Sequence, residues 1–285
     1  MPAISSTSLF HYTKKKSALW GILENGFRFS YCFEQFDDEI AKFTNKSEFE
    51  LMKLISPDDY KMGIAIPMVC FCDIPLLRAD THRIKYGKYC IGLDKDKVRM
   101  QLPSINPVFY ASSNWIQHSL EKIVEVLPSD KKLRDYRNLV KQKTEGLETI
   151  QAVKCLIDNN IIPPDNYNII PSVNLLLSLL KTDFSCYNER EWRIFFNEDC
   201  GVKYNLTQND FDKCKDEYNK SLVNSYSTFS SDVIKHIIVN KESEIPNAIK
   251  KINRFRTILG KEISYEDKQL LISKITSFER IRQDF

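Results

Sequence analysis

Two glutamates one residue apart, Glu189 and Glu191, have the type and spacing that most directly suggest chemistry in this sequence. They lie in residues 188–196 (NEREWRIFF), a stretch with the composition of a β-strand. Side chains two residues apart in a strand share a face, so the two carboxylates are expected side by side. Such a pair needs a cation, or the pKa of one member rises and provides a usable catalytic carboxylate. The structural alternative has Glu189 solvated and Glu191 paired with Arg193 or a distant lysine.

A histidine and a tyrosine elsewhere in the chain are the next candidates. His11 stands in residues 8–13 (SLFHYT), which are typical of a short strand, where a lone histidine is more often structural than catalytic. Tyr86 follows His82 by four residues. The two share a face if residues 76–85 form helical turns, as the lack of alternation there indicates. Tyr86 could then stack on a flat ligand ring or pack on the sheet.

The elements that must position these residues centre on residues 66–93. Residues 66–72 are an apolar run that predicts a buried strand bounded by Pro67 and Pro75. Residues 89–93 predict a second strand, which the chain enters after the short helix. This strand, helix and strand unit places polar side chains near strand ends, where the ligands of sheet-based domains are usually held.

The rest of the chain predicts one α+β domain over residues 1–285, with C-terminal helices. A helix is predicted over residues 14–25, with Thr13 or Ser17 as its N-cap and Gly26 at its end. Further strands are predicted at residues 27–33, 106–110 and 231–240, and further helices at residues 245–259 and 265–281. Residues 113–180, rich in Leu, Lys, Glu and Gln, predict a helical insertion.

The composition and the missing motifs exclude several classes of protein. Lys and Arg total 41 against 38 Asp and Glu, so the chain has no polycationic signature. It shows neither a signal peptide nor an apolar run of membrane-spanning length, so we expect a soluble, cytoplasmic protein without a membrane partner. The P-loop, GxGxxG, GxSxG and HExxH motifs are absent from the sequence.

The cysteines and one lysine run allow two further expectations. Among eight cysteines the one close pair is Cys70 and Cys72, without a second CxxC or a histidine pair at ligand spacing. We therefore expect buried reduced thiols and no metal site. The run Lys14, Lys15 and Lys16 fits a solvated entrance to the first helix, or an anionic ligand near the start of that helix.

These motifs together resemble the AbiGi-type family of abortive-infection, phage-resistance proteins. The resemblance rests on SLFHYT with the following GILENGF, on IPMVCFCDIPL followed by His82 and YGKYCIGL, on NPVFY, and on YNEREWR. It covers residues 8–110 and the region near residue 190. It implies a role in phage defence, and the family label also includes an antitoxin assignment.

At the level of the fold, the chain is also similar to ADP-ribosyltransferases of the histidine–tyrosine–glutamate type. In that fold a first-strand histidine holds the nicotinamide ribose, a later tyrosine stacks on the nicotinamide, and a strand-start glutamate polarises the ribose. The resemblance implies these roles for His11, for Tyr86 and for Glu189 or Glu191. It also implies an ADP-ribosyltransferase-like core with a mixed or antiparallel sheet.

The same resemblance implies NAD as a substrate and sets out the expected site. Glu191 and Glu189 are the expected catalytic residues. The expected NAD-binding residues are His11, Tyr12, Thr13, Tyr86 and His82.

Three functions follow as hypotheses. The first is an NAD-dependent ADP-ribosyltransferase, or an NAD glycohydrolase, that acts in phage defence on a macromolecular target, either protein or nucleic acid. The second is a non-catalytic antitoxin that binds a toxin through residues 113–180. The third is an RNA-binding or RNA-cleaving effector, motivated by Lys14, Lys15 and Lys16 and by the aromatic residues of 27–36.

Overall fold

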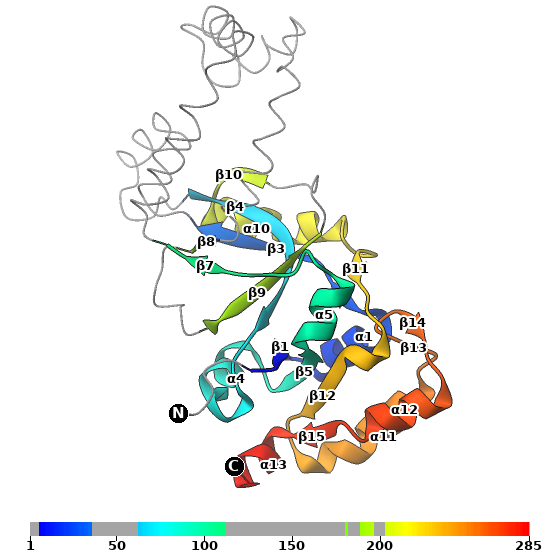
Figure 1. The fold of residues 1–285 in the computed structure, drawn as a ribbon. Helices are drawn as coiled ribbons and strands as arrows, with labels where there is room; N and C mark the ends of the chain where they lie inside the picture. Colours follow the sequence, from blue (N-terminus) through cyan, green and yellow to red (C-terminus); the bar gives the residue numbers. More distant parts are fainter. Residues whose placement is uncertain (1–5, 36–61, 112–179, 182–188, 197–202, 285) are drawn as a thin grey trace, which may run out of the picture. The chain divides into compact units, whose positions relative to one another are not determined.

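The computed structural model describes residues 6–35, 62–111, 180–181, 189–196 and 203–284 (Figure 1). Apart from residue 111, these residues belong to one compact unit, formed by Met1–Gln35, Met62–Tyr110 and Leu179–Phe285. The predicted helical insertion, residues 113–180, lies outside the described residues except for its last residue, Leu180, which is in a short strand.

Nine of the described strands build one large mixed sheet. These strands are β1 (Ser8–Thr13), β3 (Ser30–Gln35), β4 (Met62–Cys72), β5 (Tyr89–Asp94), β6 (Asn106–Pro107), β9 (Glu191–Phe195), β10 (Lys203–Thr207), β12 (Ile234–Val239) and β15 (Ile275–Ser277). Their order is β15, β12, β5, β1, β4, β9 and β6, and both β3 and β10 also pair with β4. Neighbours in this sheet run antiparallel except β12 and β15, which are parallel. The predicted α+β class with a mixed sheet is confirmed.

Short strand pairs and helices complete the described unit. The short pairs are β2 (Phe27–Arg28) with β11 (Tyr226–Ser227), β7 (Phe109–Tyr110) with β8 (Leu180–Lys181), and β13 (Thr257–Ile258) with β14 (Lys261–Glu262). The helices are α1 (Lys16–Asn25), η1 (Leu76–Arg78), α4 (Asp80–Tyr86), α5 (Lys95–Gln101), α10 (Gln208–Lys220), η5 (Ser231–Val233), η6 (Glu242–Glu244), α11 (Ile245–Arg254), α12 (Tyr265–Ile272) and α13 (Phe278–Asp284).

The central strand β4 is longer than the sequence predicted. Pro67 lies inside it, opposite Tyr31 of β3, so the prediction that Pro67 bounds the strand is wrong. Proline has no backbone N–H to donate to a neighbouring strand. It is tolerated here because the edge of β4 that carries the Pro67 nitrogen faces β9, and the residue pairing between β4 and β9 extends only as far as Met68. The carbonyl of Pro67 still accepts a bond from the Phe196 amide at 3.1 Å.

The first helix ends as predicted but begins differently. Gly26 follows α1 with a φ of 100°, a conformation that favours glycine. The N-cap residue is Lys15, without a side-chain cap, so the prediction of Thr13 or Ser17 is wrong. The Thr13 hydroxyl donates to the Lys15 carbonyl at 3.2 Å, and Ser17 already lies inside the helix.

The C-terminal region departs from the two predicted helices. The first predicted helix, residues 245–259, stops at Arg254, and the hairpin of β13 and β14 follows. The second, residues 265–281, divides into α12, the short strand β15 and α13. The predicted strand 106–110 likewise divides into β6 and β7, which pair with different strands.

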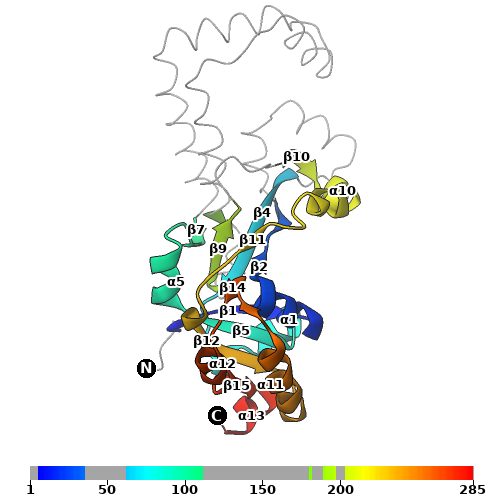
Figure 2. The same ribbon diagram turned by 90° about the vertical axis from the view of Figure 1, so that its right-hand side faces the viewer.

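The two faces of the sheet carry separate apolar clusters. On one face Leu9 packs with Leu19 and Leu23 of α1 in the main core. On the other face Phe10 packs with Phe278 of α13 in a smaller core. Val98 of α5 also belongs to the main core, and Figure 2 shows α1 and α5 near opposite ends of β1 and β5.

The sheet opens between β1 and β4, and this opening positions the candidate site. The register between these strands holds at one position, Phe10 opposite Cys72, whereas β1 pairs with β5 along its full length. Beyond Phe10 the two strands part.

No helix in the described part of the chain is long and apolar enough to cross a membrane.

Candidate functional site

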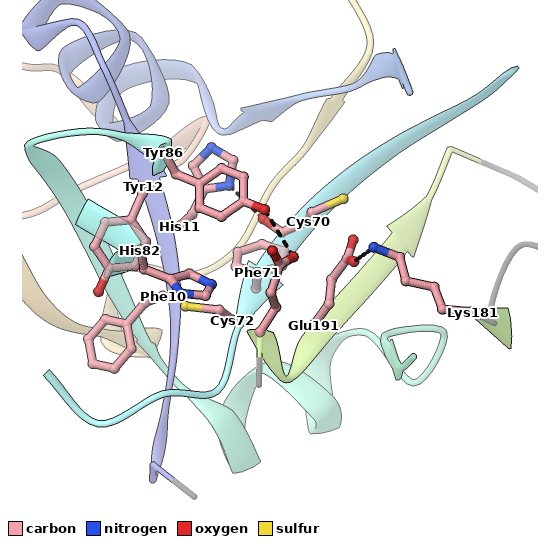
Figure 3. A pocket seen from close by; sticks show the side chains of 11 residues that line it. Phe10, His11, Tyr12, Cys70, Phe71, Cys72, His82, Tyr86, Lys181 and Glu191 are labelled. Carbon is pink, nitrogen blue, oxygen red and sulfur yellow. Dashed lines mark hydrogen bonds and ion pairs between the residues drawn. The ribbon is translucent and has the colours of Figure 1, made fainter. Parts of the chain in front are cut away.

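A pocket of about 230 Å³ lies at the opening between β1 and β4, beside α4 and the start of β9 (Figure 3). The residues that line it are Phe10, His11, Tyr12, Cys70, Phe71, Cys72, His82, Tyr86, Lys181, Glu189 and Glu191. The sequence-predicted site residues that come together here are His11, Tyr12, His82, Tyr86, Glu189 and Glu191. They come from β1, α4 and the β9 segment, which are far apart in the sequence.

One predicted site residue, Thr13, lies elsewhere. Its side chain is buried and its hydroxyl is bonded to Lys15. Thr13 lines a second hollow along α1 instead of the pocket. Thr13 shares a face of β1 with His11, which lines both hollows, but it lies two residues further along the strand and reaches only the second hollow.

The end of α4 rests directly on the end of β1, and this contact sets the place of Tyr86. Gly87 has a φ of 139°, and a Cβ there would lie 2.0 Å from the Thr13 carbonyl oxygen. Only glycine permits such a close approach of two backbones. The rings of His82 and Tyr86 consequently lie near the end of β1, with His82 6.1 Å from the Tyr12 ring.

His11 occupies the gap left by the parting strands. Its Nδ1 lies 2.8 Å from the Cys70 carbonyl oxygen, and because a carbonyl only accepts, Nδ1 carries the proton. The ring also contacts Phe27 and Phe71 edge-on. Burial lowers the pKa of His11, partly offset by the bond to Cys70, so the imidazole is neutral near pH 7. Its Nε2 is then a hydrogen-bond acceptor.

Glu189 is bound to the α4 side of the pocket. Its carboxylate accepts a bond from the Tyr86 hydroxyl at 2.9 Å and forms an ion pair with Lys85. Strand β9 begins only at Glu191, because Arg190 has a φ of 46° and interrupts the extended backbone. The prediction that a strand carries both glutamates is therefore wrong for Glu189, and each carboxylate has its own partners.

Glu191 is bound on the opposite side by two cations. Its oxygens lie 2.9 and 3.2 Å from Arg193 Nε and Nη2, and 2.7 Å from Lys181 Nζ. Figure 3 shows Lys181 reaching Glu191 from β8. The buried Arg193 side chain also bonds Glu34 at 2.8 Å. We call Glu34, Lys181, Glu191 and Arg193 the Arg193 cluster.

The pKa values of the two carboxyl groups in the Arg193 cluster are shifted in opposite directions. Burial pushes the pKa of Glu191 upward, but Arg193 and Lys181 outweigh it and bring that pKa down to about 2. Burial raises the pKa of Glu34, and the same two cations offset only part of the rise. The expected raised pKa is therefore not found at Glu191. The structural alternative holds for Glu191, which pairs with both cations, but it is wrong for Glu189, whose side chain is 16% exposed and bound by Lys85 and Tyr86.

The Cys72 and Cys90 thiols, in and behind the pocket, are poor nucleophiles because burial raises the pKa of both. Cys72 and Cys90 are buried free thiols, and burial raises the pKa of Cys72 to about 12. Burial also raises the pKa of the neighbouring Tyr12 hydroxyl. Among the described residues, no group of three or more His, Cys, Asp or Glu side chains could hold a metal ion.

The sequence reasoning missed Lys181, which lines the pocket, and Lys85, which forms an ion pair with the pocket residue Glu189. Lys85 precedes Tyr86, and its position next to a candidate residue on a short helix was a usable signal. Lys181 lies in a strand of two residues that pairs with β7, and its neighbourhood gave no signal. These lysines supply the cations that the glutamate pair needs.

The fold and the site define a mixed α+β protein with a small, charged pocket at an opening in its sheet. The family described as "Putative abortive phage resistance protein AbiGi, antitoxin" matches residues 52–240, so the chain belongs to the AbiGi family. A relative from Lactococcus lactis subsp. cremoris, "Abortive phage resistance protein AbiGi", is 28% identical over 234 residues, which are 77% of this chain and 89% of the relative. No solved structure matches. The predicted family resemblance is confirmed.

Proposed function

We propose that this protein acts in phage defence by consuming NAD, either to transfer ADP-ribose to a macromolecule or to hydrolyse NAD. The observation that carries the proposal is the convergence of His11, Tyr86, Glu189 and Glu191 on one pocket. These residues follow the histidine, tyrosine and glutamate order along the chain. An ADP-ribosyltransferase-like core, opened between β1 and β4, is part of the proposal.

The pocket suits one flat ring of the dinucleotide. Its volume of about 230 Å³ is below the range of roughly 300–1,000 Å³ typical of sites for drug-sized ligands. Tyr86 is 36% exposed and offers a ring face or edge to a bound heterocycle. We expect the nicotinamide to lie against Tyr86 and a ribose hydroxyl or carboxamide N–H to donate to His11 Nε2.

The proposed reaction uses a fixed negative charge. The bond between the ribose C1′ and the nicotinamide nitrogen breaks, and nicotinamide leaves with the bonding electrons. Positive charge develops on the ribose, which a nearby carboxylate stabilises electrostatically. An acceptor hydroxyl, amine or water then bonds to C1′ and releases its proton to solvent. Glu191 suits the stabilising role, since its pKa of about 2 keeps it ionised at physiological pH.

Glu189 and Glu191 have different roles in the proposed reaction. A carboxylate with so low a pKa is a poor base, so Glu191 is not assigned the proton of the acceptor. Glu189 bonds the Tyr86 hydroxyl, and its contact with Lys85 brings it to the more exposed edge of the pocket. We assign Glu189 to positioning the Tyr86 ring and orienting the acceptor.

The test follows label from NAD carrying a radioactive adenylate phosphate, in extract of phage-infected cells. His11→Asn retains an N–H donor for the Cys70 carbonyl but lacks Nε2, and Glu191→Gln removes the charge. We expect each change to reduce transfer of the label to a macromolecule, or its release as free ADP-ribose, about a hundredfold. Glu34→Gln is the matched control, since Glu34 bonds Arg193 without lining the pocket. Activity indifferent to His11→Asn and Glu191→Gln would overturn the proposal.

A non-catalytic antitoxin is the second candidate, and a specific observation favours it. Both oxygens of Glu191 are already bound by Arg193 and Lys181, as expected of a structural carboxylate. The description of the matched family also carries the word antitoxin. This candidate predicts that His11→Asn leaves phage protection and the capture of a toxin partner unchanged. Loss of protection in a folded His11→Asn variant would count against it.

A further inference from the structure

A second hollow of about 390 Å³ runs along α1 and meets the pocket at His11. His11 lines both hollows. The second hollow is also lined by Ser17, Gly21 and Asn25 of α1, Arg28 of β2 and Tyr226 of β11. We call this hollow the α1 groove. Its volume falls within the usual range of small-molecule sites, roughly 300–1,000 Å³.

Gly21 leaves the wall of the α1 groove open. A Cβ added at this residue would meet no atom within 4 Å. Glycine in the middle of a helix is unfavourable relative to alanine, and no close backbone approach explains it here. The effect of Gly21 is to widen the groove at the middle of α1.

Among the described residues that line the α1 groove, Arg28 carries the one formal charge at pH 7, and this charge is positive. Arg28 is exposed and forms no ion pair with any residue that the structure describes. Lys14 and Lys15, exposed at the start of α1, are likewise without an ion pair in the described ranges, whereas Lys16 pairs with Glu244 at 2.9 Å. None of the described residues that line the groove is a carboxylate. Hydroxyl, amide and guanidinium groups of this kind recognise phosphate and sugar.

We propose that the α1 groove binds a phosphate-bearing nucleotide, with the phosphate toward Arg28 and the sugar toward His11. The phosphate can belong to NAD itself, whose nicotinamide end would occupy the pocket on the other side of His11. It can also belong to a nucleotide acceptor that approaches His11 along α1. Only the placement of NAD across His11, with its nicotinamide end in the pocket, rests on the proposed function. Phosphate binding in the α1 groove requires no catalysis.

The experiment measures binding of two probes, ADP-ribose and a single-stranded oligonucleotide of eight nucleotides, by isothermal titration calorimetry of the full chain. Gly21→Leu fills the groove, and Gly21→Ala is its matched control with the smallest possible side chain. Arg28→Glu reverses the charge that Arg28→Lys keeps. We expect Gly21→Leu and Arg28→Glu to weaken at least one probe about tenfold or more.

A control variant shows whether weaker binding is specific to the α1 groove, and the two probes distinguish the two sources of the phosphate. Arg99→Glu makes the same charge change on α5, away from α1 (Figure 2), and should leave binding unchanged. Weakening of ADP-ribose alone supports the phosphate of NAD, and weakening of the oligonucleotide alone supports a nucleotide acceptor. If Gly21→Leu and Arg28→Glu bind both probes like the wild type, the inference is overturned. Groove-dependent binding without NAD turnover would refute the proposed function alone.

Discussion

Replacing Glu191 by glutamine should destabilise the protein in a way that depends on pH. The change is nearly isosteric and removes one charge from the Arg193 cluster. The guanidinium of Arg193 is 0% exposed, so it loses a partner that water cannot replace. Glu191 itself is 11% exposed, so solvent screening of the lost interaction is weak.

The magnitude follows from the pKa of Glu191. Its fall from the ordinary 4.5 to about 2 corresponds, at ~1.4 kcal/mol per pKa unit, to about 3 kcal/mol of stability. Glu34 stays beside the same guanidinium and can take over part of the pairing. We therefore expect Glu191→Gln to lower the free energy of unfolding by about 2 kcal/mol at pH 7.

The sign with pH is fixed by the direction of the shift. The pKa of Glu191 is lower in the folded than in the unfolded protein, so its contribution is complete above about pH 4.5 and disappears as the pH falls toward 2. The deficit of Glu191→Gln should shrink over that range. Glu34 has the opposite shift, so Glu34→Gln should change stability by less than about 1 kcal/mol at pH 7.

Urea unfolding followed by circular dichroism, at several pH values between 3 and 7, tests this account. The double variant Glu34→Gln/Glu191→Gln leaves Arg193 without a carboxylate in the cluster and should cost more than the sum of the two single changes. A Glu191→Gln deficit that is constant over this pH range, or below about 0.5 kcal/mol at pH 7, would refute the reasoning.

Three further predictions concern other parts of the site. Gly21→Ala should raise the free energy of unfolding by about 0.5–1 kcal/mol in urea titrations, because its Cβ meets no atom within 4 Å; a loss of stability would show that the wall is closed. Gly87→Ala should lower it by about 1–3 kcal/mol, because of its φ of 139° and the Thr13 carbonyl; a neutral effect would contradict the described contact. Cys72, with its pKa near 12, should react with iodoacetamide at pH 8 only after unfolding, and rapid modification of native protein detected by mass spectrometry would disagree.

Local patterns were sufficient to predict the strands and turns that carry the pocket. The segment SLFHYT, typical of a short strand, predicted β1, and the apolar run of residues 89–93 predicted β5. The lack of alternation in residues 76–85 predicted helical turns, and α4 forms there. These features depend on neighbours in the sequence, which is why the sequence alone indicates them.

Long-range geometry explains what the sequence could not predict. Lys181 reaches Glu191 only because β8 pairs with β7, and no local pattern records that pairing. Arg190 adopts a positive φ that its residue type does not suggest. β15 occupies three residues within a helix-like pattern and forms by pairing with β12. In each case tertiary contacts override local preference.

Release of nicotinamide from NAD in extract of phage-infected cells tests the central claim most directly, since both ADP-ribosyl transfer and NAD hydrolysis produce it. We expect release by the wild type and by Glu34→Gln, and a loss of about a hundredfold in His11→Asn, whose fold is checked by its unfolding midpoint. Equal release by the wild type and His11→Asn, or no release above that of extract alone, would contradict it.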